Sequence, residues 1–437
     1  MEILATLFQT IGDLFVGKTN GTPNWMMIIM WIIGGVLIYL AIKKEMEPTL
    51  LLPIGFGAII MNFPGLIETT ERVVCKVCDL PVGECIDSVT HAASHITETV
   101  NHFTGAAEPL NTLYNAGIAN ELFPLILFIG IGAMIDFGPL LNNPKLMLFG
   151  AAAQFGIFFT LCLASIFFPD FRDYASIAII GAADGPTSIV VANTLGSHYI
   201  GAITVAAYSY MALVPVIQPP VIKLLTTKNE RRIRMSYKAT SVSKTTRILF
   251  PIIITVIACL FAPGAGSLIG FLMFGNLIRE CGVLDSLSDT AQKVLANLIT
   301  IFLGITIAFN MTASQFLNIN TLLIMGLGLI AFIVDTAGGV LFAKLYNVFA
   351  SIFKFEKINP MIGAAGISAF PMAGRIVHKM ALEEDNENFI LMHSIGVNVS
   401  GQIASVIAGA LVLKFFVPML EGGAATAMLQ GVMNLFA

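Results

Sequence analysis

The sequence has 437 residues, of which 56% are hydrophobic and 11% are charged, and its mean hydropathy is +0.85. A soluble domain carries about 25% charged residues, so this composition excludes an ordinary soluble protein and indicates an integral membrane protein. The net charge of −4 does not orient the chain, because orientation depends on Lys and Arg in short loops. The apolar runs do not alternate, which excludes a β-barrel, and they predict an all-α polytopic fold of about nine to eleven spanning or half-spanning helices.

We expect residues 1–63 to form an N-terminal unit. Met1–Gly17 alternates apolar and polar residues at helical spacing and lacks the basic start of a secretory signal, which predicts an interfacial amphipathic helix. A first span over Trp25–Ile42 and an apolar segment over Leu50–Phe63 follow. The chain contains neither a GxxxxGK[ST] phosphate-binding motif nor a nucleic-acid-binding signature, so no nucleotide-driven pumping and no nucleic-acid partner are expected.

Residues 64–119 form an insertion rich in Asp and Glu, long enough to be a small domain or a lid. Its cysteines and histidines superficially resemble a zinc set, but no second CxxC completes the pattern. A disulfide and two histidines on one helix face are the favoured explanation. The residues concerned are Cys75, Cys78, Cys85, His91, His95 and His102.

Basic residues predict which side of the membrane each loop faces. Between Lys223 and Arg247 the sequence has eight Lys and Arg residues against one acidic residue, Glu230. Loops rich in Lys and Arg face the cytoplasm, so we predict a cytoplasmic loop here and place the acidic insertion on the outer side. Residues 226–297 then form this loop and the helices that link two larger units.

Those two units, residues 120–225 and 298–437, show a similar order of elements. Each has a glycine-containing helix, a long span, an interrupted helix and a further polar span. One interrupted helix in each of two halves is typical of secondary transporters, and an inverted relation between the halves would bring the interruptions together near the membrane midplane.

The first interruption is Gly181-Ala-Ala-Asp-Gly-Pro-Thr-Ser188. Inside a bilayer, a chain breaks a helix only where protein or a water-filled cavity satisfies the freed backbone groups. An acid at such a position costs at least about 2.5–3.5 kcal/mol on insertion, so Asp184 is the leading candidate for a cation ligand and proton-coupling group. The alternative is a turn at the headgroup level, but the apolar flanks are each too short to span alone.

The second interruption begins at Asn359-Pro360 and ends at Pro371. Asn359 and Ser368 offer oxygen atoms that suit a hard cation such as Na⁺, and Gly363 lets backbone carbonyls approach. Arg375 follows and would bind a carboxylate. The alternative for Arg375 is an ordinary basic residue near a helix end, beside His378 and Lys379.

Several further polar residues occur in apolar runs, each with a structural alternative. Tyr210, and less so Tyr208, would donate a proton or a hydrogen bond, although tyrosine is common at membrane interfaces for packing alone. Asp136 and Asp335 would be second cation ligands or helix caps. Asn398, with Ser400 and Gln402 on the last span, would reach the site or make interhelical hydrogen bonds worth about 0.6 kcal/mol each.

Several long strings make the chain similar to a known family. They are Gly181-Ala-Ala-Asp-Gly-Pro-Thr, Tyr208-Ser-Tyr-Met-Ala-Leu-Val-Pro-Val-Ile-Gln-Pro-Pro, Asn359-Pro-Met-Ile-Gly-Ala-Ala-Gly-Ile-Ser and Pro371-Met-Ala-Gly-Arg. Together they resemble the β subunit of the biotin-dependent, sodium-translocating decarboxylases. The resemblance covers nearly all of the chain except the insertion.

The resemblance implies a subunit of the bacterial cytoplasmic membrane that decarboxylates carboxybiotin, consumes a proton and exports Na⁺. It implies cation-binding and proton-coupling roles for seven positions: Asp184, Tyr210, Asn359, Gly363, Ser368, Arg375 and Asn398. Arg375 and Asn359 would bind the carboxybiotin. It also implies a homotrimer with three partners: a biotin-carrier subunit, a carboxyltransferase subunit and a small single-span membrane subunit.

Two other functions fit the residues alone. Interrupted helices in two related halves also occur in carriers that exchange Na⁺ for H⁺ or an organic anion without chemistry. A non-catalytic membrane scaffold would tolerate alanine at Asp184 and Asn359. The acyl substrate of the complex cannot be derived, because it would never meet this subunit.

Overall fold

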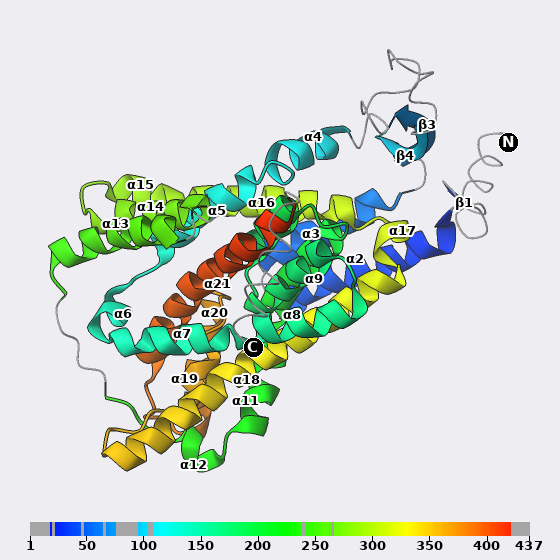
Figure 1. Cartoon of the computed structure of the whole chain (residues 1–437). Coiled ribbons are helices and arrows are strands. Elements are labelled where there is room, and N and C mark those ends of the chain that lie inside the picture. Colours follow the sequence, from blue (N-terminus) through cyan, green and yellow to red (C-terminus); the bar gives the residue numbers. More distant parts are fainter. Residues whose placement is uncertain are drawn as a thin grey trace, which may run out of the picture.

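The computed structural model describes residues 18–19, 22–44, 48–63, 67–75, 95–103, 108–236, 242–261, 263 and 266–420. Most of these residues are helical, as Figure 1 shows. The predicted helix over Met1–Gly17 lies outside the described residues, and so do Cys78, Cys85 and His91 of the insertion.

The N-terminal third contains the strands and the first helices. The elements in chain order are β1 (Lys18–Thr19), β2 (Thr22–Pro23), α2 (Asn24–Lys44), α3 (Pro48–Met61), β3 (Ile67–Cys75), β4 (His95–Phe103), α4 (Glu108–Gly117), α5 (Leu122–Met134), α6 (Gly138–Asn142) and η2 (Pro144–Leu146). Strands β3 and β4 pair antiparallel, with Cys75 opposite His95, so the insertion contains a β-hairpin.

The rest of the described chain is helical. Its elements are α7 (Met147–Ala153), α8 (Phe155–Phe167), α9 (Phe171–Ala178), η3 (Ile179–Ala182), α10 (Gly185–Leu195), α11 (Ile200–Leu225), α12 (Lys228–Arg231), α13 (Lys244–Phe261), α14 (Gly266–Glu280), α15 (Asp285–Asp289), η5 (Thr290–Leu295), α16 (Ala296–Ile307), η6 (Ala308–Asn310), α17 (Ala313–Phe316), α18 (Ile319–Phe353), α19 (Met361–Ala364), α20 (Met372–Glu384) and α21 (Leu391–Leu420).

Among the described residues, five continuous helical segments are long and apolar enough to cross a membrane, and counting two bent pairs as spans gives up to 7. The five segments are Asn24–Lys43, Pro144–Phe167, Asp285–Asn310, Ile319–Phe353 and Leu391–Leu420. The bent pairs are Pro109–Gly117 with Leu122–Met134, at 65°, and Ile200–Met211 with Leu213–Leu225, at 66°. The protein is therefore a multi-pass, helical membrane protein, and the count of nine to eleven, which includes half-spanning helices, stays a prediction.

The outer helices expose many large apolar side chains. On α2, Ile32, Val36 and Ile42 are all at least half exposed, and only 17% of the most apolar stretch of this helix is buried inside the protein. A soluble protein rarely shows such a continuous apolar surface. Lipid is the solvent that this surface requires.

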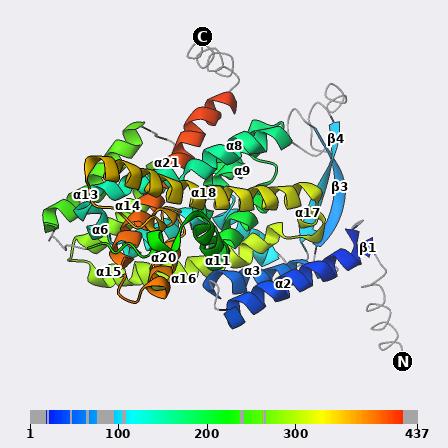
Figure 2. The same ribbon diagram turned by 90° about the horizontal axis from the view of Figure 1, so that it is seen from below.

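The basic loop and the acidic insertion lie at opposite ends of the molecule. Figures 1 and 2 show the β3–β4 hairpin near the first residues of α18, and the last residues of α18 at the far end. In Figure 1, α12, which belongs to the basic loop, lies at that far end. This arrangement agrees with loops on opposite sides of a membrane.

The order of elements repeats along the chain. In the first half, α5 precedes the long α7–α8 segment, an interrupted α9–α10 segment and α11. In the second half, α16 precedes the long α18, an interrupted α19–α20 segment and α21. The first series lies within the expected range 120–225, and the second begins at Ala296, two residues before the expected boundary at 298. The two units as domains and the inverted relation between them stay predictions.

Helices around the second interruption cross at glycine. A Cβ atom added to Gly339 of α18 would collide with the carbonyl oxygen of Gly363 on α19, and one added to Gly363 would collide with the carbonyl oxygen of Gly339. Small residues at such crossings let membrane helices pack backbone against backbone. The close approach of α18 and α19 therefore depends on these two glycines.

We predict that Gly339→Ala lowers stability by about 1–3 kcal/mol, because backbone on the facing helix cannot yield as a flexible side chain does. The measurement is thermal unfolding of the purified chain in detergent. Gly326→Ala, also on α18, is the matched control, because a Cβ there meets nothing within 4 Å. Equal unfolding temperatures for Gly339→Ala and the control would contradict the prediction.

Candidate functional site

The two interrupted helices meet inside the molecule. Between η3 and α10, residues Ala183 and Asp184 leave the helical path, and Ala183 takes a left-handed conformation at φ 51°. The backbone N–H of Ser368, in the second interruption, donates to the carbonyl oxygen of Ala182 at 3.1 Å. Each interruption thus satisfies a backbone group that the other leaves free.

Asp184 begins α10 and holds its first turn. Its Oδ1 accepts from the backbone N–H of Thr187 at 3.3 Å, and its Oδ2 accepts from the Thr187 hydroxyl at 2.8 Å. An aspartate at the N-cap followed by proline in the first turn is a favourable helix start. The local sequence therefore fixes this carboxylate at the first residue of the half-helix.

Three further donors reach Asp184 Oδ2 from distant parts of the chain. The hydroxyl of Ser368 lies at 3.2 Å, the Nε2 of Gln402 at 3.1 Å and the hydroxyl of Ser405 at 2.9 Å. Gln402 and Ser405 are three residues apart on α21, so they lie on one helix face. We call Asp184, Thr187, Ser368, Gln402 and Ser405 the Asp184 cluster.

The Asp184 carboxyl is buried, with 3% of the residue exposed, and its hydrogen-bond partners within the described chain are all neutral. Burying an unpaired charge is expensive, so such a site requires either a proton or a bound cation. A hydroxyl group both donates and accepts hydrogen bonds. The three hydroxyls can therefore donate to Asp184 now and offer lone pairs to a cation.

Asn398 lies on α21, one turn before Gln402, and makes a hydrogen bond to the second interruption. The Nδ2 of Asn398 donates to the carbonyl oxygen of Ile367 at 2.7 Å. Its Oδ1 is buried and has no hydrogen-bond partner among the described residues. Asn398 thus lies beside the Asp184 cluster with an unused acceptor.

Asn359 is held elsewhere. Its Nδ2 donates to the carbonyl oxygens of Arg231 at 2.8 Å and Ile233 at 3.0 Å, and its Oδ1 accepts from the N–H of Met361 at 3.1 Å. The structure therefore does not bring the Asn359 amide to Asp184, because the basic loop occupies its donors. Gly363, for its part, lies at the crossing with Gly339.

Ion pairs tie the same loop to the end of α20. Arg231 Nε donates to Glu384 at 2.7 Å, and this bond holds the pKa of Glu384 below its usual value. Arg234 likewise donates to Asp385 at 2.7 Å and lowers its pKa. Carboxyls with lowered pKa values stabilise the loop at neutral pH and lose that contribution as the pH falls through those values.

Tyr210 on α11 and Arg375 on α20, the predicted proton donor and carboxylate-binding residue, lie apart from the Asp184 cluster. Tyr210 is buried and its hydroxyl donates to the carbonyl oxygen of Met325. Arg375 is exposed near the start of α20. Tyr208 lies closer to Asp184, because its ring fills the space that a side chain at Gly185 would need. The structure thus brings Asp184 and Ser368 together and adds Tyr208, while Tyr210 and Arg375 are separate.

Sequence reasoning missed Ser405, and for Gln402 it left open a place at the site or an interhelical hydrogen bond. The signal available was their spacing, since residues 398, 402 and 405 share one face of a helix without charged residues around them. For Asp136, we predicted either a cation ligand or a helix cap. Its Oδ1 accepts from the N–H of Gly138, the first residue of α6, at 2.8 Å, as a capping residue does.

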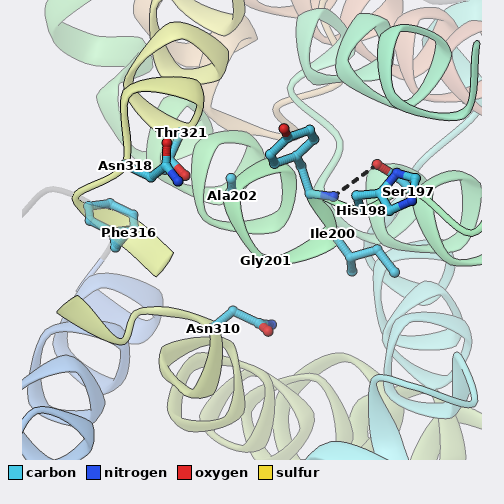
Figure 3. A pocket seen from close by; sticks show the side chains of 10 residues that line it. Ser197, His198, Ile200, Gly201, Ala202, Asn310, Phe316, Asn318 and Thr321 are labelled. Atoms are coloured by element: carbon cyan, nitrogen blue, oxygen red, sulfur yellow. Dashed lines mark hydrogen bonds between the residues drawn. The ribbon is translucent and has the colours of Figure 1, made fainter. Parts of the chain in front are cut away.

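Two cavities open at the ends of the molecule. At the end near the start of α18, which we call the outer end after its predicted orientation, a cavity of about 290 Å³ lies beside the first residues of α11; it is shown in Figure 3 and its walls include His198, Asn310 and Asn318. At the basic end, a cavity of about 790 Å³ is lined by Lys145, Lys357, Glu356 and Arg234, among others, and Arg234 is already paired with Asp385. Basic side chains outnumber acidic ones in the lining of this second cavity, which favours an anion.

One group of potential metal ligands occurs among the described residues: Asp170, Asp173 and His198, at the outer end. Hydrogen bonds explain the most buried of them, because Asp173 Oδ1 accepts from the Ser197 hydroxyl and from the His198 N–H, both at 2.9 Å. These residues join α9 to the turn before α11.

Comparison with known proteins decides the family. The sequence model for the Na⁺-transporting oxaloacetate decarboxylase beta subunit matches residues 26–416. This chain belongs to that family. The resemblance noted in the sequence is confirmed, and the chain is a membrane subunit of a sodium-transporting decarboxylase.

Curated relatives of this β subunit agree along nearly their whole length. A methylmalonyl-CoA decarboxylase subunit beta from Propionigenium modestum is 45% identical over 94% of this chain and 100% of its own. The oxaloacetate decarboxylase beta chain of Klebsiella pneumoniae is 44% identical over 96% of this chain and 100% of its own. A probable oxaloacetate decarboxylase beta chain from Vibrio cholerae is 44% identical over 90% of this chain and 96% of its own.

We predict that Asn359→Ala loosens the basic loop of this subunit, because the Ile233 carbonyl loses its side-chain donor and the Arg231 carbonyl keeps only the Asn388 amide. Trypsin cleavage at Arg231, Arg232 and Arg234, followed in detergent at neutral pH, should become several-fold faster. Asn320→Ala is the control, since the Asn320 amide donates to Tyr199 at the other end of the molecule. An unchanged cleavage rate at the three arginines would show that Asn359 does not anchor the loop.

Proposed function

We propose that this β subunit decarboxylates carboxybiotin and uses the energy released to export Na⁺ across the cytoplasmic membrane of a bacterium. The observation that carries the proposal is the Asp184 cluster, a buried carboxylate with neutral oxygen-bearing neighbours at the meeting point of two interrupted helices. Family membership supports the sodium and the decarboxylase parts, because the relatives are named as such.

In this proposal Na⁺ is the transported substrate and Asp184 supplies the charge that balances it. The hydroxyl oxygens of Thr187, Ser368 and Ser405 turn their lone pairs to the ion, and the free Asn398 Oδ1 is a further candidate ligand. Gln402 contributes through its amide oxygen after rotation of the side chain. Asn359 and Gly363 contribute by fixing the second interruption rather than by direct contact in this conformation.

Carboxybiotin arrives on a partner subunit and is not covalently bound to this chain. We place its entry at the basic cavity, because Lys145, Arg234 and Lys357 attract an anion there. Arg375 then pairs with the carboxylate. When CO₂ leaves, the N–C bond breaks and the ureido nitrogen takes a proton, for which Tyr210 is the proposed donor.

The packing supports the proposal that Tyr210 and Arg375, near the start of α20, act on the same carboxybiotin. Tyr210 belongs to the same buried apolar cluster as Ala369 and Ala373, and Ile376 packs against that cluster. Arg375 lies in sequence between these last two residues. Because Arg375 is exposed and lies about 100° around the helix from Ile376, α20 must rotate as well as approach α11 to bring the guanidinium to the phenol.

Coupling follows from charge balance at the Asp184 cluster. A protonated Asp184 cannot balance Na⁺, and an ionised one in an apolar interior needs the cation. Proton uptake and Na⁺ binding therefore exclude each other at this carboxyl. Decarboxylation consumes a proton, and this changes whether the Asp184 carboxyl holds a proton or Na⁺.

The proposed assembly is a homotrimer of this chain with a biotin-carrier subunit, a carboxyltransferase subunit and a small single-span membrane subunit. The relatives' names differ in the acyl substrate, oxaloacetate or methylmalonyl-CoA. Such a substrate would transfer its carboxyl group to biotin on the carboxyltransferase subunit. This chain would meet only the carboxybiotin.

The rival function is a secondary carrier that exchanges Na⁺ for H⁺ or an organic anion. Vesicles that contain the complete complex distinguish the two. Sodium uptake that starts only with a carboxybiotin donor supports the pump. Sodium exchange driven by a gradient alone, with no effect of the donor, supports the carrier.

We predict that Asp184→Asn abolishes Na⁺-dependent decarboxylation in such vesicles, because the neutral amide cannot balance the ion. Ser405→Ala should raise the Na⁺ concentration for half-maximal rate about tenfold, the value expected for one lost hydrogen bond to a charged group. Ser351→Ala is the control, because that exposed hydroxyl only donates to Asn347 of its own helix. Near-normal Na⁺-stimulated turnover in Asp184→Asn would refute the proposal.

A further inference from the structure

A second buried acid lies in the middle of α18. Asp335 has no exposed surface, and neither of its carboxyl oxygens has a hydrogen-bond partner among the described residues. The hydroxyls of Thr336 and Thr160, also fully buried, have no partner there either. An unsatisfied buried carboxyl is costly, so its presence requires a reason other than packing.

Asp335 faces the first interruption. A side chain at Gly156 would collide with Asp335 Oδ1, and a Cβ added to Gly181 would lie 3.1 Å from Oδ2. The backbone N–H groups of Gly156 and Ile157, at the start of α8, lie near the carboxyl without completing a hydrogen bond to it, and that of Ile157 donates to the carbonyl oxygen of Gln154 at 3.1 Å. The carboxyl is thus enclosed between α18, the first turn of α8 and η3.

Asp184 follows on the same short segment. Gly181 is three residues before Asp184, so at most about 10 Å separates their Cα atoms. The two acids therefore lie at the same short segment: Asp335 contacts it at Gly181, and Asp184 is the residue that ends it. Both are buried and neither has a basic partner in the described structure.

Among the described residues, the other titratable group close to Asp184 is Tyr208, whose buried hydroxyl also has no hydrogen-bond partner. The titratable groups on the helices packed against α18 and η3 are Tyr208, Tyr210 and Lys223 on α11, Cys162 on α8, and Arg172, Asp173 and Tyr174 on α9. Tyr210 is bonded to Met325, ten residues before Asp335, and Asp173 is bonded to Ser197 and His198. Asp184 is therefore the titratable group that responds most directly to the charge of Asp335.

We propose that Asp335 is a proton-carrying residue of the translocation machinery, protonated in this conformation and ionised when Na⁺ occupies the Asp184 cluster. Burial without a completed hydrogen bond favours a proton on Asp335 while the Asp184 cluster holds no ion. A sodium ion beside Asp184 brings a positive charge to the turn that Asp335 faces, which favours the ionised form. The first amides of α8 then stabilise an ionised Asp335, because a helix N-terminus favours negative charge.

The inference rests on the proposed Na⁺ site, and proton release by the purified full-length chain in detergent tests it. Sodium chloride or choline chloride is added in weak buffer, while a pH dye reports protons and radioactive sodium reports binding. Wild-type protein should release protons only with sodium. Asp335→Asn should still bind sodium and release about one proton fewer per chain.

Asp173→Asn is the matched control, a buried aspartate whose replacement should leave proton release at the wild-type value. Unchanged proton release in Asp335→Asn would overturn the inference and leave Asp335 as a structural cap of α8. Sodium binding that persists in Asp184→Asn would instead refute the proposed Na⁺ site. The two failures are therefore distinguishable.

If Asp335→Asn does not fold, infrared difference spectra of the wild-type chain provide the test. Sodium should remove the carbonyl stretch of a protonated carboxylic acid, and Asp335→Glu should shift that band. A difference spectrum without such a band, or a band unaffected by Asp335→Glu, would contradict the proposal.

Discussion

The buried carboxylate of Asp184 is the constraint on which the site depends. Its donors come from its own half-helix, from the second interruption and from the last long helix, so a single side chain joins three parts of the chain. None of these donors carries a charge that would cancel the carboxylate. The fold therefore encloses an ionisable group whose hydrogen-bond partners among the described residues are all neutral.

Helix interruptions are tolerable here because each one is completed by another element. The N–H of Ser368 closes on Ala182, and the glycines at 339 and 363 allow the surrounding helices to approach at backbone distance. In a lipid environment, free N–H and C=O groups have no water to bind. Close crossings and exchanged hydrogen bonds thus supply what the bilayer cannot.

The second interruption also connects the membrane interior with the basic end. Asn359 begins it and binds the loop carbonyls of Arg231 and Ile233, while Ser368 near its end reaches Asp184. Arg231 in turn pairs with Glu384 at the end of α20. A partner that moves the basic loop would therefore act on a segment that directly contacts the carboxylate.

The sequence by itself determined the membrane class, the helical fold and the two interruptions that hold Asp184 and Ser368, because composition and an acid in an apolar break are local signals. Only the tertiary structure showed that Gln402 and Ser405 complete the cluster, that Asn359 anchors a loop and that Asp335 faces η3. Gln402 lies 218 positions from Asp184 in the chain. Contacts over such separations depend on which helix faces meet, and hydropathy does not record that choice.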